Sequence, residues 1–315
     1  MRAAMIFPGQ GSQFVGMGKD LYAEFPVARE VYDMADEALG FKMTELCFDG
    51  EKEILTETRN AQPAILIHSV AVMEVLREEI GLEPSVTAGH SLGEYTALVA
   101  AGVFDPMDAL KVVRRRGELM FRAGQKHPGT MAAILGMDRQ QVSRICAGVS
   151  TPGNVVVLAN INCPGQIVIS GHVDAVNSAM EEAAEQGARK VVPLTVSGAF
   201  HSPLVAEAEG ELVEYINSFE INDASVEVIS NAGANPVRTR EEIVDSLSRQ
   251  LTNPVLWEDS MRVMLDKVDE EPVLELGPGR VLTGLMKRID RSRPVTACGT
   301  AGEVKKLVAE TVRLT

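Results

Sequence analysis

Cysteine is scarce in this chain, and positive charge is outweighed by negative charge. Only four of the 315 residues are cysteine, and none forms a C-x-x-C pair or a Cys/His cluster with zinc-site spacing. We therefore expect no metal site and no disulfide framework, but reduced thiols in a cytoplasmic protein. Lys and Arg number 30 against 44 Asp and Glu, and the resulting charge of −14 argues against broad binding to nucleic acid or to an anionic membrane.

Long hydrophobic runs are also missing. No apolar stretch approaches the roughly 18 residues that a membrane-spanning helix needs, and the stretch before Pro8 is too short for a signal-peptide core. Hydrophobic residues nevertheless make up 45% of the chain, which suits a folded protein with a large core. At roughly 150 residues per domain, the length predicts two domains, or one large domain with an insertion.

Short apolar runs alternate with longer amphipathic segments, a pattern typical of α/β proteins. Proline and glycine mark several helix ends, with Pro63 expected in the first turn of one helix and Gly81 just past its end. We expect strands at residues 4–7, 86–88 and 272–276, and helices at residues 61–80, 92–101, 105–123 and 280–286.

The middle of the chain predicts a smaller unit of its own. Strands and helices are expected there in the order β-α-β-β-α-β, the ferredoxin-like arrangement. We expect the strands at 130–135, 155–161, 166–170 and 189–196, and the helices at 138–147 and 173–186. The interpretation is a small domain over residues 126–197, inserted into a large α/β-hydrolase-like domain with a parallel sheet over residues 1–125 and 198–315.

The strongest local motif is GHSLG at residues 89–93, which matches G-x-S-x-G between a short strand and a helix. In a nucleophile elbow the serine sits on a sharp turn at a helix N-terminus, where peptide dipoles favour developing negative charge. Ser91 is thus a candidate nucleophile, with the backbone N–H of Leu92 as an oxyanion donor. A simple N-cap is the alternative for this serine.

A serine nucleophile needs a base, and five histidines are available. His68 lies in an apolar helix and is interpreted as a packing residue, and His90 is expected to point away from Ser91. His201 follows the small domain in a loop, where catalytic residues often gather. It is the favoured base, with an ordinary loop histidine as the alternative. No acidic residue stands out as its partner, so a backbone carbonyl is expected to orient it.

Further motifs run almost the whole length of the chain in a family-like order. They are FPGQGSQ at 7–13 with GMG at 16–18, AQPA at 61–64, GHSLGEY at 89–95, Arg116-Gly117, NIN at 160–162 with PGQ at 164–166, GAFHS at 198–202, Gln250 with PVLW at 254–257, and ELGPG at 275–279. Together they make the sequence closely resemble the malonyl-CoA:acyl carrier protein transacylase family. No departure is found at the catalytic positions.

The resemblance implies a role for each matching residue. Ser91 would carry a malonyl ester, His201 would be its base, and the main-chain carbonyl of Gln250 would orient the histidine. Backbone N–H groups of Gln10 and Leu92 would form the oxyanion hole. The family needs no metal or organic cofactor, because coenzyme A is part of the substrate.

Arg116 is the residue implied to bind the malonyl carboxylate, because a guanidinium pairs with a carboxylate in a two-pronged manner. Arg114 and Arg115 point about 100° and 200° away on the same helix, so a solvated basic face is favoured for them. Met120, one turn further on, shares the face of Arg116 and is expected to line the pocket. Phe200 and Asn162 are further candidates for substrate contact, with core packing and a turn hydrogen bond as the alternatives.

The implied reaction is transfer of malonyl from malonyl-CoA to the phosphopantetheine thiol of acyl carrier protein, in fatty acid synthesis. Because that carrier is itself acidic, a local basic rim must receive it. Two separate runs are candidates, Arg189 with Lys190 and the run of Lys287, Arg288, Arg291 and Arg293, and an ordinary solvated surface is the alternative for either. A stand-alone polyketide or malonate decarboxylase malonyltransferase is the nearest alternative, and a serine thioesterase or a non-catalytic scaffold is more distant. We expect a monomer.

Overall fold

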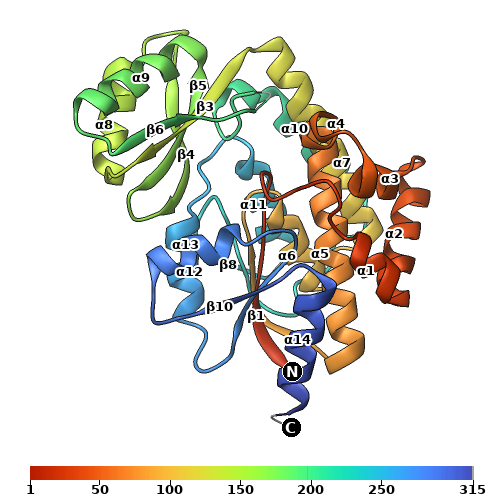
Figure 1. The fold of residues 1–315 in the computed structure, drawn as a ribbon. Helices are drawn as coiled ribbons and strands as arrows, with labels where there is room; N and C mark the ends of the chain where they lie inside the picture. The colour runs from red at the N-terminus through yellow and green to blue at the C-terminus, as the bar shows by residue number, and fades with distance from the viewer. Residues whose placement is uncertain (197, 314–315) are drawn as a thin grey trace.

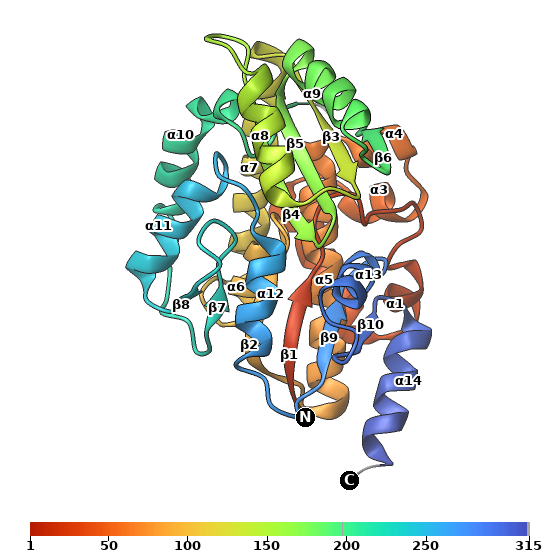
Figure 2. The same ribbon diagram turned by 90° about the vertical axis from the view of Figure 1, so that its left-hand side faces the viewer.

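The computed structural model describes residues 1–196 and 198–313, and within them the chain forms one sheet of six strands and one of four (Figures 1 and 2). The larger sheet has the strand order β10-β9-β1-β2-β7-β8 and is parallel apart from the antiparallel pair of β7 and β8. Its strands are β1 (Arg2–Phe7), β2 (Glu83–Gly89), β7 (Val228–Ile229), β8 (Pro236–Val237), β9 (Val273–Leu276) and β10 (Val295–Cys298).

Helices cover both faces of this sheet. Side chains of β1 alternate between two separate hydrophobic clusters: Met5 and Phe7 pack with α5, while Ile6 packs with α12 and α13. The helices are α1 (Lys19–Glu24), α2 (Pro26–Leu39), α3 (Met43–Asp49), α4 (Lys52–Thr56), α5 (Thr58–Ile80), α6 (Gly93–Ala100), α7 (Pro106–Lys126), η1 (Pro203–Val205), α10 (Glu207–Ile216), α11 (Arg240–Gln250), α12 (Trp257–Leu265), α13 (Val281–Ile289) and α14 (Ala301–Val312). The expected α/β class is confirmed.

The central strands place two functional loops beside each other. β1 and β2 pair in parallel as far as Phe7 opposite Gly89, so both strands end at the same edge of the sheet. The loop with Gln10 follows β1, and the turn with Ser91 follows β2. In open α/β sheets this carboxyl edge is where ligands bind.

The smaller sheet is antiparallel, with the order β4-β5-β3-β6 and both of its helices on one face. Its elements are β3 (Gly129–Leu135), α8 (Arg139–Val149), β4 (Val156–Cys163), β5 (Gln166–His172), α9 (Val173–Glu185) and β6 (Lys190–Pro193). The β-α-β-β-α-β order and this strand order form a ferredoxin-like sheet. Backbone hydrogen bonds from Val255 to Ala159 and from Ile161 to Val255 tie β4 to the segment before α12.

Several boundaries differ from the prediction, and two of the differences bear on the site or on the domain division. Helix α5 starts at Thr58, so Pro63 lies in its second turn rather than its first. A proline there leaves the carbonyl of Arg59 without its helical donor, and Arg114 Nη1 donates to that oxygen at 2.9 Å instead. Strand β6 is four residues long, shorter than the predicted 189–196, and Ser197 at the predicted domain boundary lies outside the described residues. Among the described helices, none is long and apolar enough to cross a membrane.

Candidate active site

Ser91 lies on the sharp turn between β2 and α6, as the motif predicts. Its φ of 51° is in the left-handed region, which residues with a side chain rarely adopt. Glycines allow the turn to pack this tightly, because a Cβ on Gly93 would be 2.1 Å from the Phe7 carbonyl oxygen and one on Gly89 would be 1.9 Å from the Gly93 backbone. The elbow is therefore fitted against β1.

A histidine and a backbone carbonyl complete a chain of hydrogen bonds from Ser91. The Ser91 Oγ lies 2.8 Å from His201 Nε2, and His201 Nδ1 lies 2.9 Å from the Gln250 carbonyl oxygen. A carbonyl can only accept, so Nδ1 carries the hydrogen and Nε2 is free to accept from the serine. Gln250 is the last residue of α11, where helical carbonyls lack an internal partner.

His201 is held as a neutral imidazole. It is 4% exposed, and its φ of 56° is a second left-handed backbone at this site. Burial, followed by the positive charge of Arg116, lowers the pKa of His201 to about 3. The ring is consequently in its proton-accepting form at neutral pH.

Arg116 is the only described arginine with a fully buried side chain, and it reaches Ser91 from α7. Its Nη2 donates to Ser91 Oγ at 3.1 Å and to Gln250 Oε1 at 3.0 Å, and its Nη1 donates to Gln62 Oε1 at 2.7 Å. The guanidinium also lies 5.6 Å from the centre of the Tyr95 ring. Each of these polar partners is uncharged, so no carboxylate of the described residues bonds the cation directly.

The described cavity beside Ser91 is small, with a volume of about 120 Å³. Gln10, His90, Leu92, Arg116, Met120 and Phe200 line it together with Ser91 and His201, and Met131 on β3 with Leu194 and Val196 after β6 add an apolar wall. In the described residues no acceptor faces the backbone N–H of Gln10 or Leu92, so both are available to a ligand.

Asn162 does not line this cavity. It is buried, and its Oδ1 is 2.8 Å from Nε2 of His90, whose ring packs on Trp257. The His90 ring thus bonds Asn162 rather than Ser91, and His90 is nevertheless among the residues that line the cavity. Asn160, two residues earlier on β4, lines the cavity and is the better placed of the two asparagines.

The favoured interpretation of Arg114 and Arg115 as a solvated basic face is wrong. Arg114 is about three-quarters buried and bonds Glu118, Asn60 Oδ1 and the Arg59 carbonyl. Arg115 pairs with Glu211 on α10 and with Glu118. Both tie α7 to its neighbouring helices, and Arg116 alone of the three faces the cavity.

Sequence reasoning missed several supporting residues. Gln62, which accepts from Arg116, donates from Nε2 to the Thr58 hydroxyl, and that hydroxyl donates to Gln10 Oε1 at 2.7 Å. Gln62 lies in the AQPA motif, so a signal for it was present. Asn231 accepts from the Ser91 N–H at 2.6 Å and donates to the Gly89 carbonyl at 2.7 Å, thereby clamping the elbow. No motif marked Asn231.

The other histidines lie outside the site. His68 is fully buried between the Tyr32 hydroxyl and the Gly299 carbonyl, which confirms its packing role, while His127 caps α7 and His172 ends β5. Within the part of the chain that the structure describes, no group of three His, Cys, Asp or Glu could hold a metal ion, and all four cysteines are unpaired and buried.

A family model described as the acyl transferase domain matches residues 4–314 of the chain. The chain belongs to this family. Among similar acyl transferases, the malonyl CoA-acyl carrier protein transacylase of Bacillus subtilis (strain 168) is 46% identical over 312 residues, 99% of this chain and 98% of that protein. The enzyme of the same name from Staphylococcus aureus (strain MRSA252) is 43% identical, over 96% of this chain and 97% of that protein.

Solved acyl transferase structures share the whole fold. The malonyl-CoA:acyl carrier protein transacylase of Xanthomonas oryzae pv. oryzae superposes with a TM-score of 0.93 at 38% identity, over 98% of this chain and 97% of that one. A malonyl-transacylase solved in complex with its type II polyketide synthase acyl-carrier protein gives 0.94 at 38% identity, over 98% and 100%. The parallel-containing sheet and the separate antiparallel sheet are thus those of this enzyme family.

Proposed function

We propose that the protein transfers a malonyl group from malonyl-CoA to the phosphopantetheine thiol of acyl carrier protein, through a malonyl ester on Ser91. One observation carries the proposal: a buried guanidinium lies within hydrogen-bonding distance of a serine that is already paired with a neutral histidine. When the thioester carbonyl of a substrate is bound at Ser91, a carboxylate two carbons further along the acyl chain would lie within reach of Arg116. The close malonyl transacylase relatives support the same reaction.

In the first half-reaction, Ser91 Oγ attacks the thioester carbonyl carbon and its proton passes to His201 Nε2. The negative charge on the carbonyl oxygen is received by the unpaired N–H groups of Gln10 and Leu92. As the tetrahedral intermediate collapses, the carbon–sulfur bond breaks and the leaving thiolate takes the proton from His201. The products are malonyl-Ser91 and free coenzyme A.

The second half-reaction repeats these steps in reverse with a different thiol. The carrier's phosphopantetheine thiol gives its proton to His201 Nε2 and attacks the ester carbonyl. The ester bond to Ser91 then breaks, and Oγ recovers the proton from His201. The same site serves both halves in turn, so the kinetics should be ping-pong.

Arg116 selects the acyl group by its charge. Burying a cation without a charged partner is costly. A substrate carboxylate that pairs with the Arg116 guanidinium in two-pronged geometry therefore gains more binding free energy than an uncharged acyl group does. Phe200 and Met120 narrow the cavity beside it, which favours malonyl over an acyl chain with an α-methyl branch. One methyl is worth only about 1–3 kcal/mol in such a pocket, so we expect a preference rather than exclusion.

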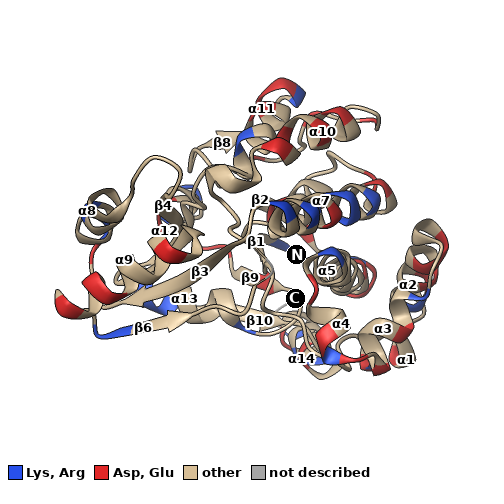
Figure 3. Cartoon of the chain, turned by 90° about the horizontal axis from the view of Figure 1, so that it is seen from above, with Lys and Arg blue, Asp and Glu red and all other residues tan. Residues whose placement is uncertain are grey.

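A basic surface beside the smaller sheet would receive the acidic carrier. The two runs that the sequence offers as separate candidates lie on either side of the turn at Pro164 and Gly165. On one side, Arg288 donates to the Pro164 carbonyl. On the other, the Gly165 carbonyl accepts from the N–H of Gly136, which packs against Arg189. Figure 3 shows basic residues at both the start of β6 and α13. Arg189, Lys190 and Lys287 are exposed and make no side-chain hydrogen bond or ion pair to the described residues. We define these three residues and Arg288 as the basic surface.

Intact-protein mass after brief mixing with malonyl-CoA tests the chemistry. The wild type should gain one malonyl group, Ser91→Ala none, and Arg116→Ala at least tenfold less in the same time, since a charged hydrogen bond is worth about 1.5–3 kcal/mol. Acetyl-CoA should label the wild type poorly. Free malonate without an adduct would instead favour the thioesterase alternative.

Three further proposals complete this function. The pathway is fatty acid synthesis. Polyketide synthesis is the alternative, and it is supported by the similar transacylase that was solved with a polyketide synthase carrier protein. The four unpaired thiols are consistent with a cytoplasmic protein. The residues proposed for the reaction all come from one chain, which agrees with a monomer. Within this monomer, the small domain is proposed to span residues 126–197.

A further inference from the structure

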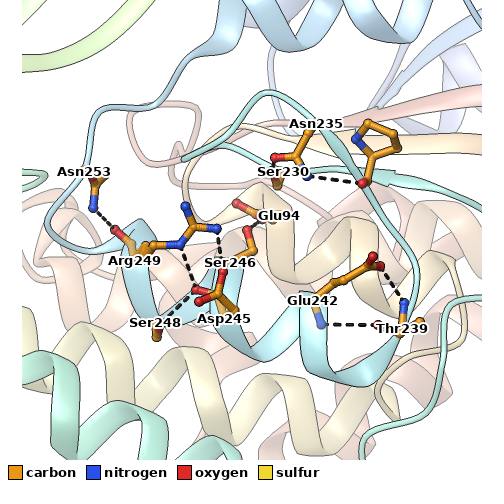
Figure 4. A network of polar contacts seen from close by, with 11 residues as sticks. Glu94, Ser230, Asn235, Thr239, Glu242, Asp245, Ser246, Ser248, Arg249 and Asn253 are labelled. Atoms are coloured by element: carbon orange, nitrogen blue, oxygen red, sulfur yellow. Dashed lines mark hydrogen bonds and ion pairs between the residues drawn. The ribbon is translucent and has the colours of Figure 1, made fainter.

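Glu94 is a buried acid that the reaction proposed above does not use. It lies in the first turn of α6, three residues after the nucleophile, and its side chain is 1% exposed. Three donors from two other segments converge on its carboxylate. Gln250 Nε2 and the Asn231 N–H bond Oε2 at 2.6 and 3.2 Å, and the Ser246 hydroxyl bonds Oε1 at 3.3 Å. Figure 4 shows Glu94 and Ser246 facing each other between α6 and α11.

Gln250 connects this acid to the reacting groups. Its Nε2 donates to Glu94 and to the Ser91 carbonyl, which leaves its Oε1 to accept from Arg116 at 3.0 Å. Its main-chain carbonyl meanwhile orients His201. A side-chain amide has one donor end and one acceptor end, so fixing the donor end fixes the acceptor end as well. If the amide were reversed, its N–H groups would face the guanidinium and repel it.

We propose that Glu94 is a positioning residue for carboxylate selection: its Oε2 holds the Gln250 amide in the one orientation that directs Arg116 toward the acyl group on Ser91. The inference rests on the proposed malonyl transfer, and it adds a residue that touches neither the substrate nor the reacting atoms. Glu94 acts on the substrate only through Gln250 and Arg116.

The acceptor, rather than the charge, is what the geometry requires. Burial raises the pKa of Glu94 to about 7, opposed by its three hydrogen bonds and by Arg116, the nearest cation. Among the described residues, the other titratable groups around it are Tyr95 on α6 itself, Arg116 on α7 and, beyond Gln250, His201. A proton taken up on Oε1 could be donated to the Ser246 hydroxyl, and Oε2 would still accept from Gln250. A glutamine at this position can make the same two contacts.

Two substitutions at Glu94 separate the acceptor from the charge. Glu94→Gln keeps an oxygen toward Gln250, and Glu94→Leu removes it. We measure initial rates of acyl-enzyme formation from malonyl-CoA and from acetyl-CoA in the same preparation. The malonyl-to-acetyl ratio should fall about tenfold in Glu94→Leu and stay within threefold of wild type in Glu94→Gln. The ratio is independent of how much enzyme is folded, so partial unfolding of either variant does not affect it.

Ser246→Ala is the matched control, because it removes the contact to Oε1 and leaves Oε2 with Gln250. Its ratio should also stay within threefold of wild type. An equal loss with both substrates in Glu94→Leu would make Glu94 merely structural and would overturn the inference, as would an equal drop of the ratio in Glu94→Gln. A wild type that forms no malonyl-enzyme would instead refute the proposed function itself, so the two failures are distinguishable.

Discussion

At the scale of single residues, the site concentrates backbone strain and buried charge. Ser91 and His201 are two of the three non-glycine residues with positive φ in the described chain, and they face each other across 2.8 Å. Such backbone conformations cost on the order of 1–3 kcal/mol each and persist only where surrounding contacts impose them. The two hydrogen bonds of Asn231 to the elbow and the bond from His201 to Gln250 are such contacts.

The burial of His201, together with the positive charge of Arg116 beside it, predicts an unusual pH dependence. His201 must be neutral to accept the serine proton, and its pKa of about 3 keeps it neutral at all pH values well above 3. Acyl-enzyme formation should therefore show no acidic limb near 6.5, the ordinary histidine value. In Arg116→Ala the loss of a nearby positive charge raises the pKa of His201, so an acidic limb should move up into the measurable range.

Initial rates with acetyl-CoA between pH 4.5 and 8 measure this, because that substrate does not depend on Arg116 for its binding. Arg115→Ala is the control, since the neighbouring arginine pairs with Glu211 away from the site. A wild-type limb near pH 6.5, or identical profiles for wild type and Arg116→Ala, would contradict the electrostatic coupling.

At the scale of elements, the elbow is built by close contact between β1, β2 and α6. An alanine at Gly93 would place a methyl group 2.1 Å from the Phe7 carbonyl, a backbone atom that cannot turn aside. β1 and α6 would have to move apart, which shifts Ser91 relative to Gln10. We expect Gly93→Ala to lower malonyl-enzyme formation at least tenfold and to destabilise the protein by about 1–3 kcal/mol.

Gly210 in α10 provides the matched control, because a Cβ there meets nothing within 4 Å. Gly210→Ala should keep full activity and stabilise the fold by up to about 1 kcal/mol, since alanine favours a helix interior. Thermal melting and intact mass measure both variants. Equal behaviour of the two alanine variants would refute the packing account of the elbow.

The same elements show what local sequence can predict. The strand, tight turn and helix around Ser91 follow from a motif of five adjacent residues. His201 is 110 residues and Arg116 25 residues from Ser91, and no spacing rule pairs them. The loop position of His201 favoured it as the base, whereas the role of Arg116 came from the family resemblance. Asn231 reaches the elbow from beyond β7, 140 residues away, and so left no local signal. The early start of α5 leaves the Arg59 carbonyl free beside Pro63, and Arg114 on α7 bonds it. The sequence of neither helix alone predicts this contact between the two.

At the scale of the whole molecule, the net charge of −14 opposes an acidic partner, so attraction must be local. The basic surface combines residues at the start of β6 with residues on α13, and the fold brings both beside the β4–β5 turn. Whether residues 126–197 form an independent domain stays a prediction, as does each catalytic role.

Isolated malonyl-enzyme mixed with carrier protein tests the basic surface. Arg189→Glu with Lys190→Glu should slow malonyl transfer to the carrier about tenfold at low salt, and the difference should shrink as salt is raised. Malonyl-enzyme formation from malonyl-CoA should not change. Arg2→Glu with Arg313→Glu is the control with the same change in charge, placed beside the chain termini at the far end of the molecule (Figure 1). Equal slowing by both pairs would refute a local docking surface.

The wild type in this experiment tests the central claim most directly. Malonyl-enzyme is freed of malonyl-CoA and mixed either with carrier protein bearing its phosphopantetheine thiol or with buffer alone, and the masses of both proteins are followed over time. We predict that the malonyl group leaves Ser91 and appears on the carrier much faster than the ester hydrolyses in buffer. Release of free malonate at the same rate in both mixtures, with an unmodified carrier, would contradict a transferase and leave a hydrolase.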